Sequence, residues 1–309
     1  MQQDKLIKII TRGGRVKLTV ARTTDIVNRA VAIHDTYPVS TAALGRTLTA
    51  ASIMGTMLKD EGASVTLRIK GDGAVSTVMA VAGQNGDVRG LISNNHVILP
   101  PNAKGKLDVS GAIGNGIIAV SKDIPSERKT GAYQPFIGQT ELISGEIAED
   151  VANYFARSEQ IPSVVGLGVL VGEDNAVISS GGFILQLIPQ SQYDGERYGD
   201  EELISKLEAN AAKMPQVSGI LNGGTLEDVA NAILGDIEYD ILEELHPQYR
   251  CTCSRERTKK ALISIGRADL TELLADNIKA KRETTQMKCQ FCGKSYRFKN
   301  DEISAVLND

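Results

Sequence analysis

Alternating apolar residues predict an extended, hairpin-rich beginning of the chain. Residues 6–10 and 16–20 alternate around Arg12-Gly13-Gly14-Arg15, which predicts a β-hairpin. Turn residues such as Gly71-Asp72-Gly73 separate further strand-like runs downstream. These strands are expected at 65–70, 75–82, 88–93, 163–171 and 183–188.

Helical patterns interrupt these strands. We expect helices at about 24–35, 39–59, 145–158 and 199–213. The second of these is rich in Ala, Gly and Thr, so it is predicted to be buried and closely packed. Strands mixed irregularly with helices favour an α+β fold over a doubly wound sheet.

A further helix is predicted over residues 225–245. Its apolar residues recur at helical spacing on one face, and the opposite face is acidic. Gly235 lies in the middle and costs ~1 kcal/mol relative to Ala, so we expect a marginal helix. The apolar stripe includes Leu226, Val229, Ile233, Ile237 and Ile241.

Composition places the chain among ordinary globular proteins. Of its 309 residues, 42% are hydrophobic but only 4% aromatic, so the core must be mainly aliphatic. No apolar run reaches the ~18 residues of a membrane helix. The charged residues Asp4 and Lys8 interrupt the first apolar stretch, which argues against a secretory signal. We therefore expect a cytoplasmic protein without a membrane partner.

The net charge of −4 conceals three blocks. Residues 1–189 are nearly neutral, residues 190–245 carry −10 and residues 246–309 carry +5. These blocks predict a core domain, an acidic helical linker region beginning at Ser191–Gly195, and a small basic C-terminal domain.

All four cysteines lie in the basic block. Cys251-x-Cys253 and Cys289-x-x-Cys292 form two knuckles separated by 35 residues. Without a signal peptide, such clustering favours metal binding or redox activity over a disulfide framework. Four thiolates at ~2.3 Å form a closed tetrahedral site, so one Zn²⁺ is expected, with no open position for hydrolysis. Gly293 is suited to the positive φ of the turn beneath it.

No enzyme is expected. The three His residues lie in unrelated contexts, and the glycine-rich segments lack the third glycine of a dinucleotide loop. No Walker-type motif is present, so no nucleotide is expected to drive the function.

The residues around the knuckles fit two zinc chemistries equally well. Basic side chains adjacent in sequence would stabilise thiolates and favour oxidation. A permanently reduced structural site is the alternative. These basic residues are Arg250, Arg255, Arg257, Lys259, Lys260, Lys288 and Lys294.

The chain resembles the heat shock protein 33 family, redox-regulated holdase chaperones of bacteria. The resemblance covers nearly the whole chain. It rests on Tyr249-Arg-Cys-Thr-Cys-Ser254, Cys289-Gln-Phe-Cys-Gly293, Tyr296-Arg-Phe298, Gly71-Asp-Gly73, Asn153–Pro162 and Gly181–Leu187.

The resemblance implies a stress-response chaperone that needs no ATP and is inactive while zinc-bound. Oxidation would form the disulfides Cys251–Cys253 and Cys289–Cys292, release zinc, and unfold both the tail and a metastable linker. A homodimer would then bind unfolding client proteins. The 35-residue spacer is longer than the family pattern leads us to expect, and residues 277–287 look like an extra loop.

The charge blocks suggest how the switch is transmitted. We hypothesise that the acidic region 190–245 docks on the basic zinc domain by attraction that salt screens within ~8–10 Å. Losing that platform would free the 225–245 helix, whose apolar stripe is the predicted client-binding surface.

Two other functions are alternatives to the holdase. A zinc-ribbon nucleic-acid-binding protein fits the +5 tail, but the −10 block would repel a polyanion and few aromatic residues are present for base stacking. A nucleic-acid partner is therefore not expected. A thiol oxidoreductase would place its C-x-x-C at the start of a helix after a strand, a pattern that the tail lacks.

Overall fold

The computed structural model describes residues 3–124, 136–189 and 201–308, and it divides the chain into two compact units. Unit 1 spans Met1–Arg250 and unit 2 spans Cys251–Asp309. The segment Ser191–Gly195, predicted as the start of the linker, lies outside the described residues.

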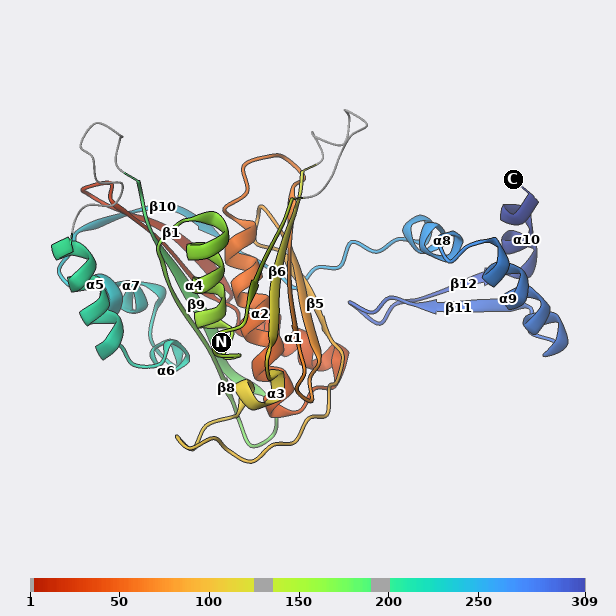
Figure 1. Cartoon of the computed structure of the whole chain (residues 1–309), viewed down its shortest axis with the longest axis horizontal. Coiled ribbons are helices and arrows are strands. Elements are labelled where there is room, and N and C mark those ends of the chain that lie inside the picture. The colour runs from red at the N-terminus through yellow and green to blue at the C-terminus, as the bar shows by residue number, and fades with distance from the viewer. Residues whose placement is uncertain (1–2, 125–135, 190–200, 309) are drawn as a thin grey trace. The chain divides into compact units, whose positions relative to one another are not determined.

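Unit 1 combines two antiparallel five-stranded sheets with helices (Figure 1). Sheet A has the strand order β10-β1-β2-β9-β8 and sheet B has the order β5-β4-β3-β6-β7. Its strands are β1 (Lys5–Thr11), β2 (Val16–Arg22), β3 (Ser64–Gly71), β4 (Thr77–Gly83), β5 (Val88–Ile92), β6 (Gly116–Asp123), β7 (Phe136–Glu141), β8 (Ser163–Val171), β9 (Val177–Leu187) and β10 (Tyr239–Leu245). Its helices are α1 (Thr24–His34), α2 (Pro38–Gly55), α3 (Val109–Ile113), α4 (Ala148–Tyr154), the π-helix η2 (Phe155–Glu159), α5 (Glu201–Lys213), α6 (Val217–Leu221) and α7 (Leu226–Leu234).

The predicted α+β fold is confirmed. The first two strands pair as the predicted hairpin, and strands were correctly expected near all of β3, β4, β5, β8 and β9. The structure adds β6, β7, α3 and α6, which the pattern of apolar residues did not reveal. Among the described residues, no helix is long and apolar enough to cross a membrane.

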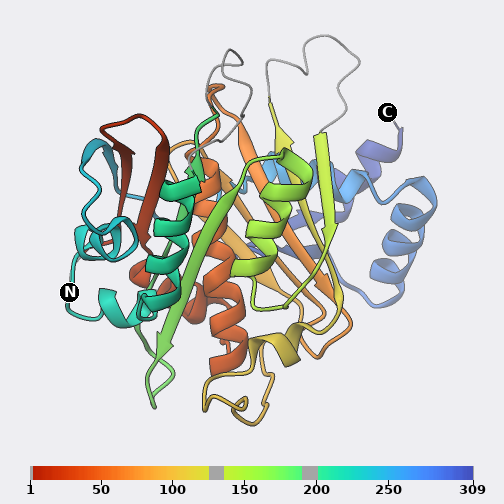
Figure 2. The same ribbon diagram turned by 60° about the vertical axis from the view of Figure 1, so that its left-hand side comes forward.

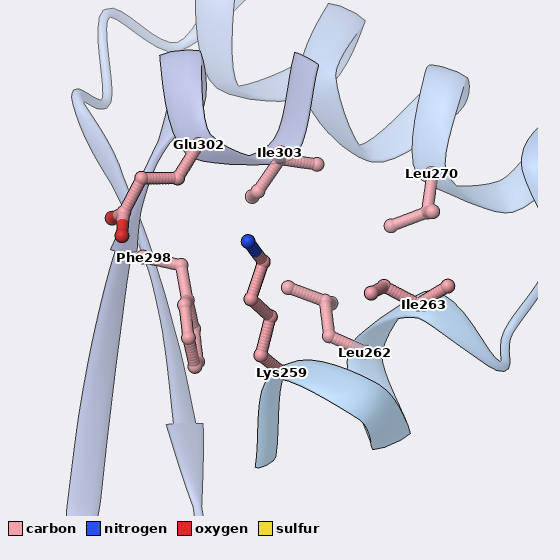
Figure 3. Close-up of a pocket in the computed structure, with 7 residues that line it drawn as sticks. All are labelled: Lys259, Leu262, Ile263, Leu270, Phe298, Glu302 and Ile303. Atoms are coloured by element: carbon pink, nitrogen blue, oxygen red, sulfur yellow. The ribbon is translucent and has the colours of Figure 1, made fainter. Parts of the chain in front are cut away.

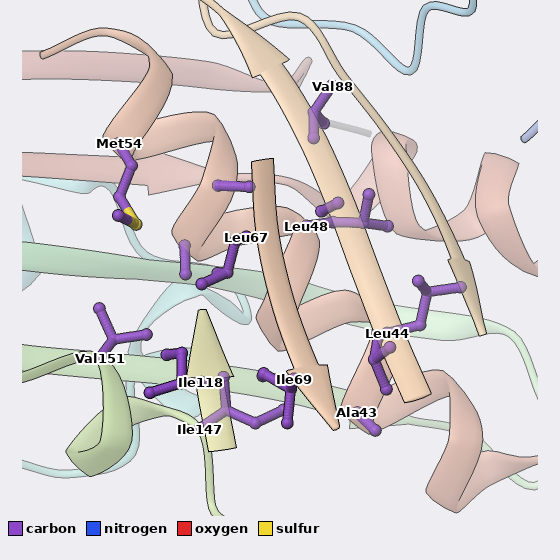
Figure 4. Packing of buried hydrophobic residues seen from close by; sticks show 14 of the residues in the cluster. Ala43, Leu44, Leu48, Met54, Leu67, Ile69, Val88, Ile118, Ile147 and Val151 are labelled. Carbon is purple, nitrogen blue, oxygen red and sulfur yellow. The ribbon is translucent and has the colours of Figure 1, made fainter. Parts of the chain in front are cut away.

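Helix α2 is the buried centre of unit 1. It contacts β8 and β9 of sheet A and β3, β4 and β5 of sheet B, and Figure 2 shows it running between the sheets. Its Leu44 and Leu48 pack among apolar side chains of sheet B such as Leu67 (Figure 4). A Cβ at Gly45 would lie 2.8 Å from Val169, so glycine is required where this helix approaches β8. The predicted close packing is therefore confirmed.

The opposite face of sheet A is covered by α5, α6 and α7. Apolar side chains of β1, β2 and β9 form a second cluster there with Leu207, Leu221 and Ile233. Because strand side chains alternate between faces, Leu6 joins the cluster around α2 whereas Ile7 joins this one.

The predicted helix over 225–245 is wrong beyond Leu234. Gly235 has φ +66°, which ends α7, and residues 239–245 form β10 antiparallel to β1. Ion pairs accompany this pairing: Lys5–Glu244 at 2.9 Å, Lys8–Glu243 at 2.7 Å and Arg12–Glu238 at 2.6 Å. These acidic side chains of the −10 block therefore have cationic partners inside their own unit.

Unit 2 is a β-hairpin with three helices. Its strands are β11 (Thr284–Lys288) and β12 (Ser295–Lys299), and its helices are α8 (Arg255–Ile263), α9 (Arg267–Lys279) and α10 (Asn300–Asn308). The inward face of the hairpin, with Met287, Tyr296 and Phe298, packs against Leu262 and Leu270 of the helices.

Candidate metal centre

The two cysteine knuckles of unit 2 are presented by different local structures. Cys251 and Cys253 lie in the extended segment that leads into α8, and Cys289 and Cys292 lie in the turn between β11 and β12. Hairpin pairing ends at Lys288↔Ser295, so the turn begins directly after the last paired residue.

The hairpin knuckle is closed by backbone hydrogen bonds. The Gly293 amide donates to the Cys289 carbonyl at 2.8 Å, and the Cys289 amide donates to the Lys294 carbonyl at 2.9 Å. Gly293 has φ +74°, as predicted from its place after Cys292, because side chains other than hydrogen rarely tolerate that conformation.

The first knuckle is fixed by the start of α8. The Ser254 hydroxyl accepts a hydrogen bond from the Arg257 amide at 3.2 Å and caps the helix. The Arg257 guanidinium reaches back to the Thr252 hydroxyl at 3.0 Å. Thr252, the residue between the two cysteines, is thereby fixed by a side chain from the first turn of α8.

The four sulfur atoms lie at the separations that a tetrahedral zinc site needs. Sγ of Cys251 is 3.7 Å from that of Cys289, and Sγ of Cys253 is 3.5 Å from that of Cys292. All four sulfurs lie within 4.8 Å of one another. A tetrahedron with Zn–S bonds of ~2.3 Å has sulfur–sulfur edges of about 3.8 Å. The donor set, four thiols and no other group, fits Zn²⁺.

One sulfur has a hydrogen-bond donor outside the tetrad. The Tyr296 hydroxyl donates to Cys253 Sγ at 3.2 Å. Burial raises the pKa of Cys253, but hydrogen bonds from Tyr296 and the other cysteines outweigh it and lower this pKa to about 7. Burial raises the pKa of Cys251 and of Cys292. The Cys253 thiol is therefore the easiest of these three to ionise.

Tyr296 was not predicted as a partner of the cysteines. Its own pKa is raised to about 12, first because it hydrogen-bonds Cys253 and then by burial. Polar and aromatic residues alternate along Ser295–Lys299, and the aromatic ones, Tyr296 among them, are buried. This alternation is the signal in the sequence that could have placed the Tyr296 ring inward.

Two of the predicted thiolate-stabilising cations form contacts with other groups. Arg255 forms an ion pair with Glu302 at 2.7 Å and lies 4.6 Å from the centre of the Phe298 ring. Arg250 pairs with Asp87 at 3.3 Å within unit 1. For these two arginines, proximity in sequence to the cysteines is not enough to assign the charge to the sulfurs, because carboxylates and an aromatic face compete for the same side chains.

The spacer between the knuckles is folded rather than an inserted loop. Residues 277–287, expected to be extra loop, contain the end of α9 and most of β11. Asn277 is buried and donates to the Thr285 hydroxyl at 2.8 Å and to the Asn300 side chain at 2.9 Å. This one amide joins the helix, the hairpin and the start of α10.

The predicted client-binding residues occupy two different environments. Leu226, Val229 and Ile233 of α7 are buried against sheet A, and Ile237 is partly buried beside them. Ile241 lies on β10 and is 40% exposed. The five residues do not form one continuous helical stripe, and their role in client binding stays a prediction.

Comparison with known proteins identifies relatives of the full length of the chain. The family model described as "Hsp33 protein" matches residues 4–299. A "33 kDa chaperonin" of Clostridium botulinum (strain 657 / Type Ba4) is 42% identical over 307 residues, covering 99% of this chain and 97% of that protein. A "33 kDa chaperonin" of Clostridium beijerinckii is 40% identical and covers 99% of each. The crystal structure of the 33 kDa chaperonin (heat shock protein 33 homolog) of Thermotoga maritima aligns with a TM-score of 0.85 at 32% identity, over 99% of this chain and 98% of that one.

Proposed function

Because this chain belongs to the Hsp33 family of chaperones, we propose that it is an ATP-independent holdase that oxidation switches on. The observation that carries the redox part of the proposal is the gathering of all four cysteines, and no other thiol, within 4.8 Å in a small separate unit. Resemblance to the family, given above, supports the holdase part.

In the reduced state, we propose that Cys251, Cys253, Cys289 and Cys292 hold one Zn²⁺. When bound, the ion supplies a tetrahedral cross-link that ties the hairpin turn to the segment before α8. Structural zinc contributes to folding free energy directly, because its ligands are not gathered in an unfolded chain.

Oxidation would remove the ligands in pairs. Two thiols of one knuckle lose two electrons and two protons, one S–S bond forms, and one hydrogen peroxide is reduced to two waters. We propose the pairs Cys251–Cys253 and Cys289–Cys292. As unit 2 opens, sulfurs of different knuckles separate, whereas sulfurs one or two residues apart in sequence remain neighbours.

Loss of the zinc cross-link would unfold unit 2 and loosen the region before it. The proposed metastable linker is 190–245, and the proposed client contacts are Leu226, Val229, Ile233, Ile237 and Ile241 once they are released. We propose unfolding client proteins as partners and a homodimer as the oxidised form. A cytoplasmic setting fits, since thiols stay reduced there until an oxidant arrives.

Light scattering from a heat-unfolding client protein tests this function. The chain is added either reduced with zinc or after treatment with peroxide at mildly raised temperature. Suppression of scattering only by the oxidised chain is expected. A Cys289→Ser, Cys292→Ser variant, oxidised in parallel, should lack the regulated response. If neither form of the natural sequence suppresses scattering, the holdase is wrong and binding to labelled nucleic acid becomes the next measurement.

A further inference from the structure

Sheet B has a covered edge directly before the cysteine switch. β5 is the terminal strand of this sheet, paired on one side with β4. On its other side lies the segment 247–250, which forms an isolated parallel bridge between Val88 and Tyr249. This segment ends at Arg250, which directly precedes Cys251.

The segment satisfies the outward-facing backbone groups of β5. The Val88 amide donates to the Gln248 carbonyl at 3.0 Å, and the Arg250 amide donates to the Val88 carbonyl at 2.9 Å. One residue pair further along, the Tyr249 hydroxyl donates to the Gly90 carbonyl at 3.0 Å and accepts from the Gly90 amide at 3.3 Å, and His34 Nε2 also lies 3.0 Å from that carbonyl. Residues 248–250 thus occupy the position of a short extra strand.

The remaining contacts of the segment are mostly polar. Asp87 accepts hydrogen bonds from the Gln248 amide at 2.9 Å and from the Arg250 guanidinium at 3.3 Å. His34 Nε2 lies 3.2 Å from the Tyr249 hydroxyl. Pro247 is buried against Gly86, but Gln248 and Arg250 are exposed. Tyr249 is half-buried and packs against the cluster around α2, but the segment is short and both neighbours of Tyr249 are exposed, so its free energy of local opening should lie below that of the central strands.

Once the segment leaves, the Val88 N–H and C=O and the Gly90 N–H lose these partners, and an uncovered sheet edge of this kind is a template for another strand. Extended polypeptide segments bind such edges through main-chain hydrogen bonds, largely independent of their sequence. Unfolding proteins offer segments of that kind. Residues 248–250 already bind this edge as a short stretch of extended backbone, so the expected ligand of the uncovered edge is another extended segment.

We propose that residues 248–250 plug the β5 edge in the reduced chain and that an extended segment of an unfolding client replaces them after oxidation. This inference rests on the proposed function and adds a client-binding surface on the core. In the reduced chain the segment is held at both ends, by β10 before it and by unit 2 after it, so it competes at an effective concentration on the order of millimolar or above and excludes clients present at micromolar concentration. Unfolding of unit 2 removes the anchor that follows Arg250 and lets the plug leave.

Hydrogen exchange of the full-length chain, read by mass spectrometry over residues 86–92, tests the inference. Three samples are compared: reduced with zinc, oxidised, and oxidised with reduced, carboxymethylated α-lactalbumin as an unfolded client. The outward amides of Val88 and Gly90 should exchange slowly in the reduced sample and at least about tenfold faster in the oxidised sample. Addition of the client should make them slow again. Residues 65–69 of β3, at the middle of sheet B, should remain slow in all three samples and show that the sheet itself stays folded.

A single variant tests the plug without oxidant. Tyr249→Phe removes the hydroxyl contacts to Gly90 and His34, so exchange over 86–92 in the reduced chain should rise about five- to tenfold. Tyr239→Phe is the matched control, because its hydroxyl donates to Asn231 beside the other sheet. Equal exchange over 86–92 in both variants would overturn the plug.

The outcomes separate this inference from the holdase function. If the oxidised chain suppresses client aggregation while residues 86–92 remain slow before client is added, or remain fast after it, the edge is not the binding surface and the holdase stands. If the oxidised chain suppresses no aggregation, the holdase fails and the inference fails with it.

Discussion

The two units of this chain differ in the interactions that can stabilise them. Unit 1 buries two extensive apolar clusters, one around α2 and one between sheet A and helices α5 to α7. Unit 2 spans residues 251–309, and its described cluster consists of Leu262, Leu270, Leu274, Tyr296, Phe298 and Ile303. A domain of about 60 residues is marginal even with a good core.

The difference shows how stability can be made conditional. The cluster around α2 contains no cysteine, so its burial does not depend on whether the thiols are reduced or oxidised. Unit 2 places its strongest potential cross-link in four thiols, whose chemistry depends on the redox state. A sensor and a stable binding platform can therefore share one chain, provided that their sources of stability stay separate.

Removal of the metal should produce the largest difference between the units. Chelation, or Cys292→Ser, is expected to remove on the order of 10 kcal/mol of apparent folding free energy from unit 2. The apolar cluster around α2 in unit 1 should keep its thermal transition. Circular dichroism, bound-zinc analysis and trypsin cleavage within residues 255–299 measure the effect.

Ser264→Ala is the matched control for that substitution. It changes a small exposed side chain at the end of α8, away from the sulfurs, and should leave zinc content and protease resistance unchanged. If unit 2 of the Cys292→Ser variant resisted trypsin as well as this control does, its apolar cluster would suffice for folding and the contrast between the units would be lost.

Two isoleucines of the predicted client-binding set should differ by a smaller but clear margin. Ile233 is fully buried beneath sheet A, so Ile233→Ala should destabilise unit 1 by about 2–5 kcal/mol. Ile241 is 40% exposed on β10, and Ile241→Ala should cost less than about 1 kcal/mol. Urea unfolding of the reduced, zinc-loaded chain compares them. Equal losses would mean that α7 is not anchored as the structure shows.

Another pair from the predicted client-binding set explains where prediction from sequence fails. Ile237 and Ile241 are four residues apart, a spacing that fits one face of a helix and also one face of a strand. The pairing that decides between them is with β1, more than 220 residues earlier, and local pattern contains no trace of it. Hairpins such as β1–β2 were predictable because both strands and the turn lie within 18 residues.

The metal centre was more predictable than the unit around it. The gathering of the four cysteines could be expected from the chain, because two closely spaced cysteine pairs are typical of a tetrahedral metal site. The contact between Tyr296 and Cys253 joins residues 43 positions apart, so it required the fold. The folded spacer was missed for the same reason: the buried amide of Asn277 has its partners 8 and 23 residues away.

The smallest expected effect on the stability of unit 2 comes from the packing of Lys259 on α8. Lys259 extends into a narrow space between Leu262, Ile303 and the Phe298 ring, as Figure 3 shows. Glu302 also lines this space, but an ion pair with a solvent-exposed carboxylate contributes little to stability. An ammonium group there keeps apolar neighbours from closing around it, since a charge retains its water. Lys259→Met has nearly the same length and no charge, so it should stabilise unit 2 by about 0.5–1 kcal/mol.

Zinc release during peroxide treatment, followed with a chromogenic indicator, measures this effect as a rate. Lys259→Met should release zinc about two- to fivefold more slowly, because a more stable unit 2 exposes its thiols less often. Lys260→Met, an exposed neighbour on the same helix, should match the natural sequence. If both variants released zinc at one rate, opening of α8 would not limit oxidation, and the sulfurs would be attacked while unit 2 is still folded.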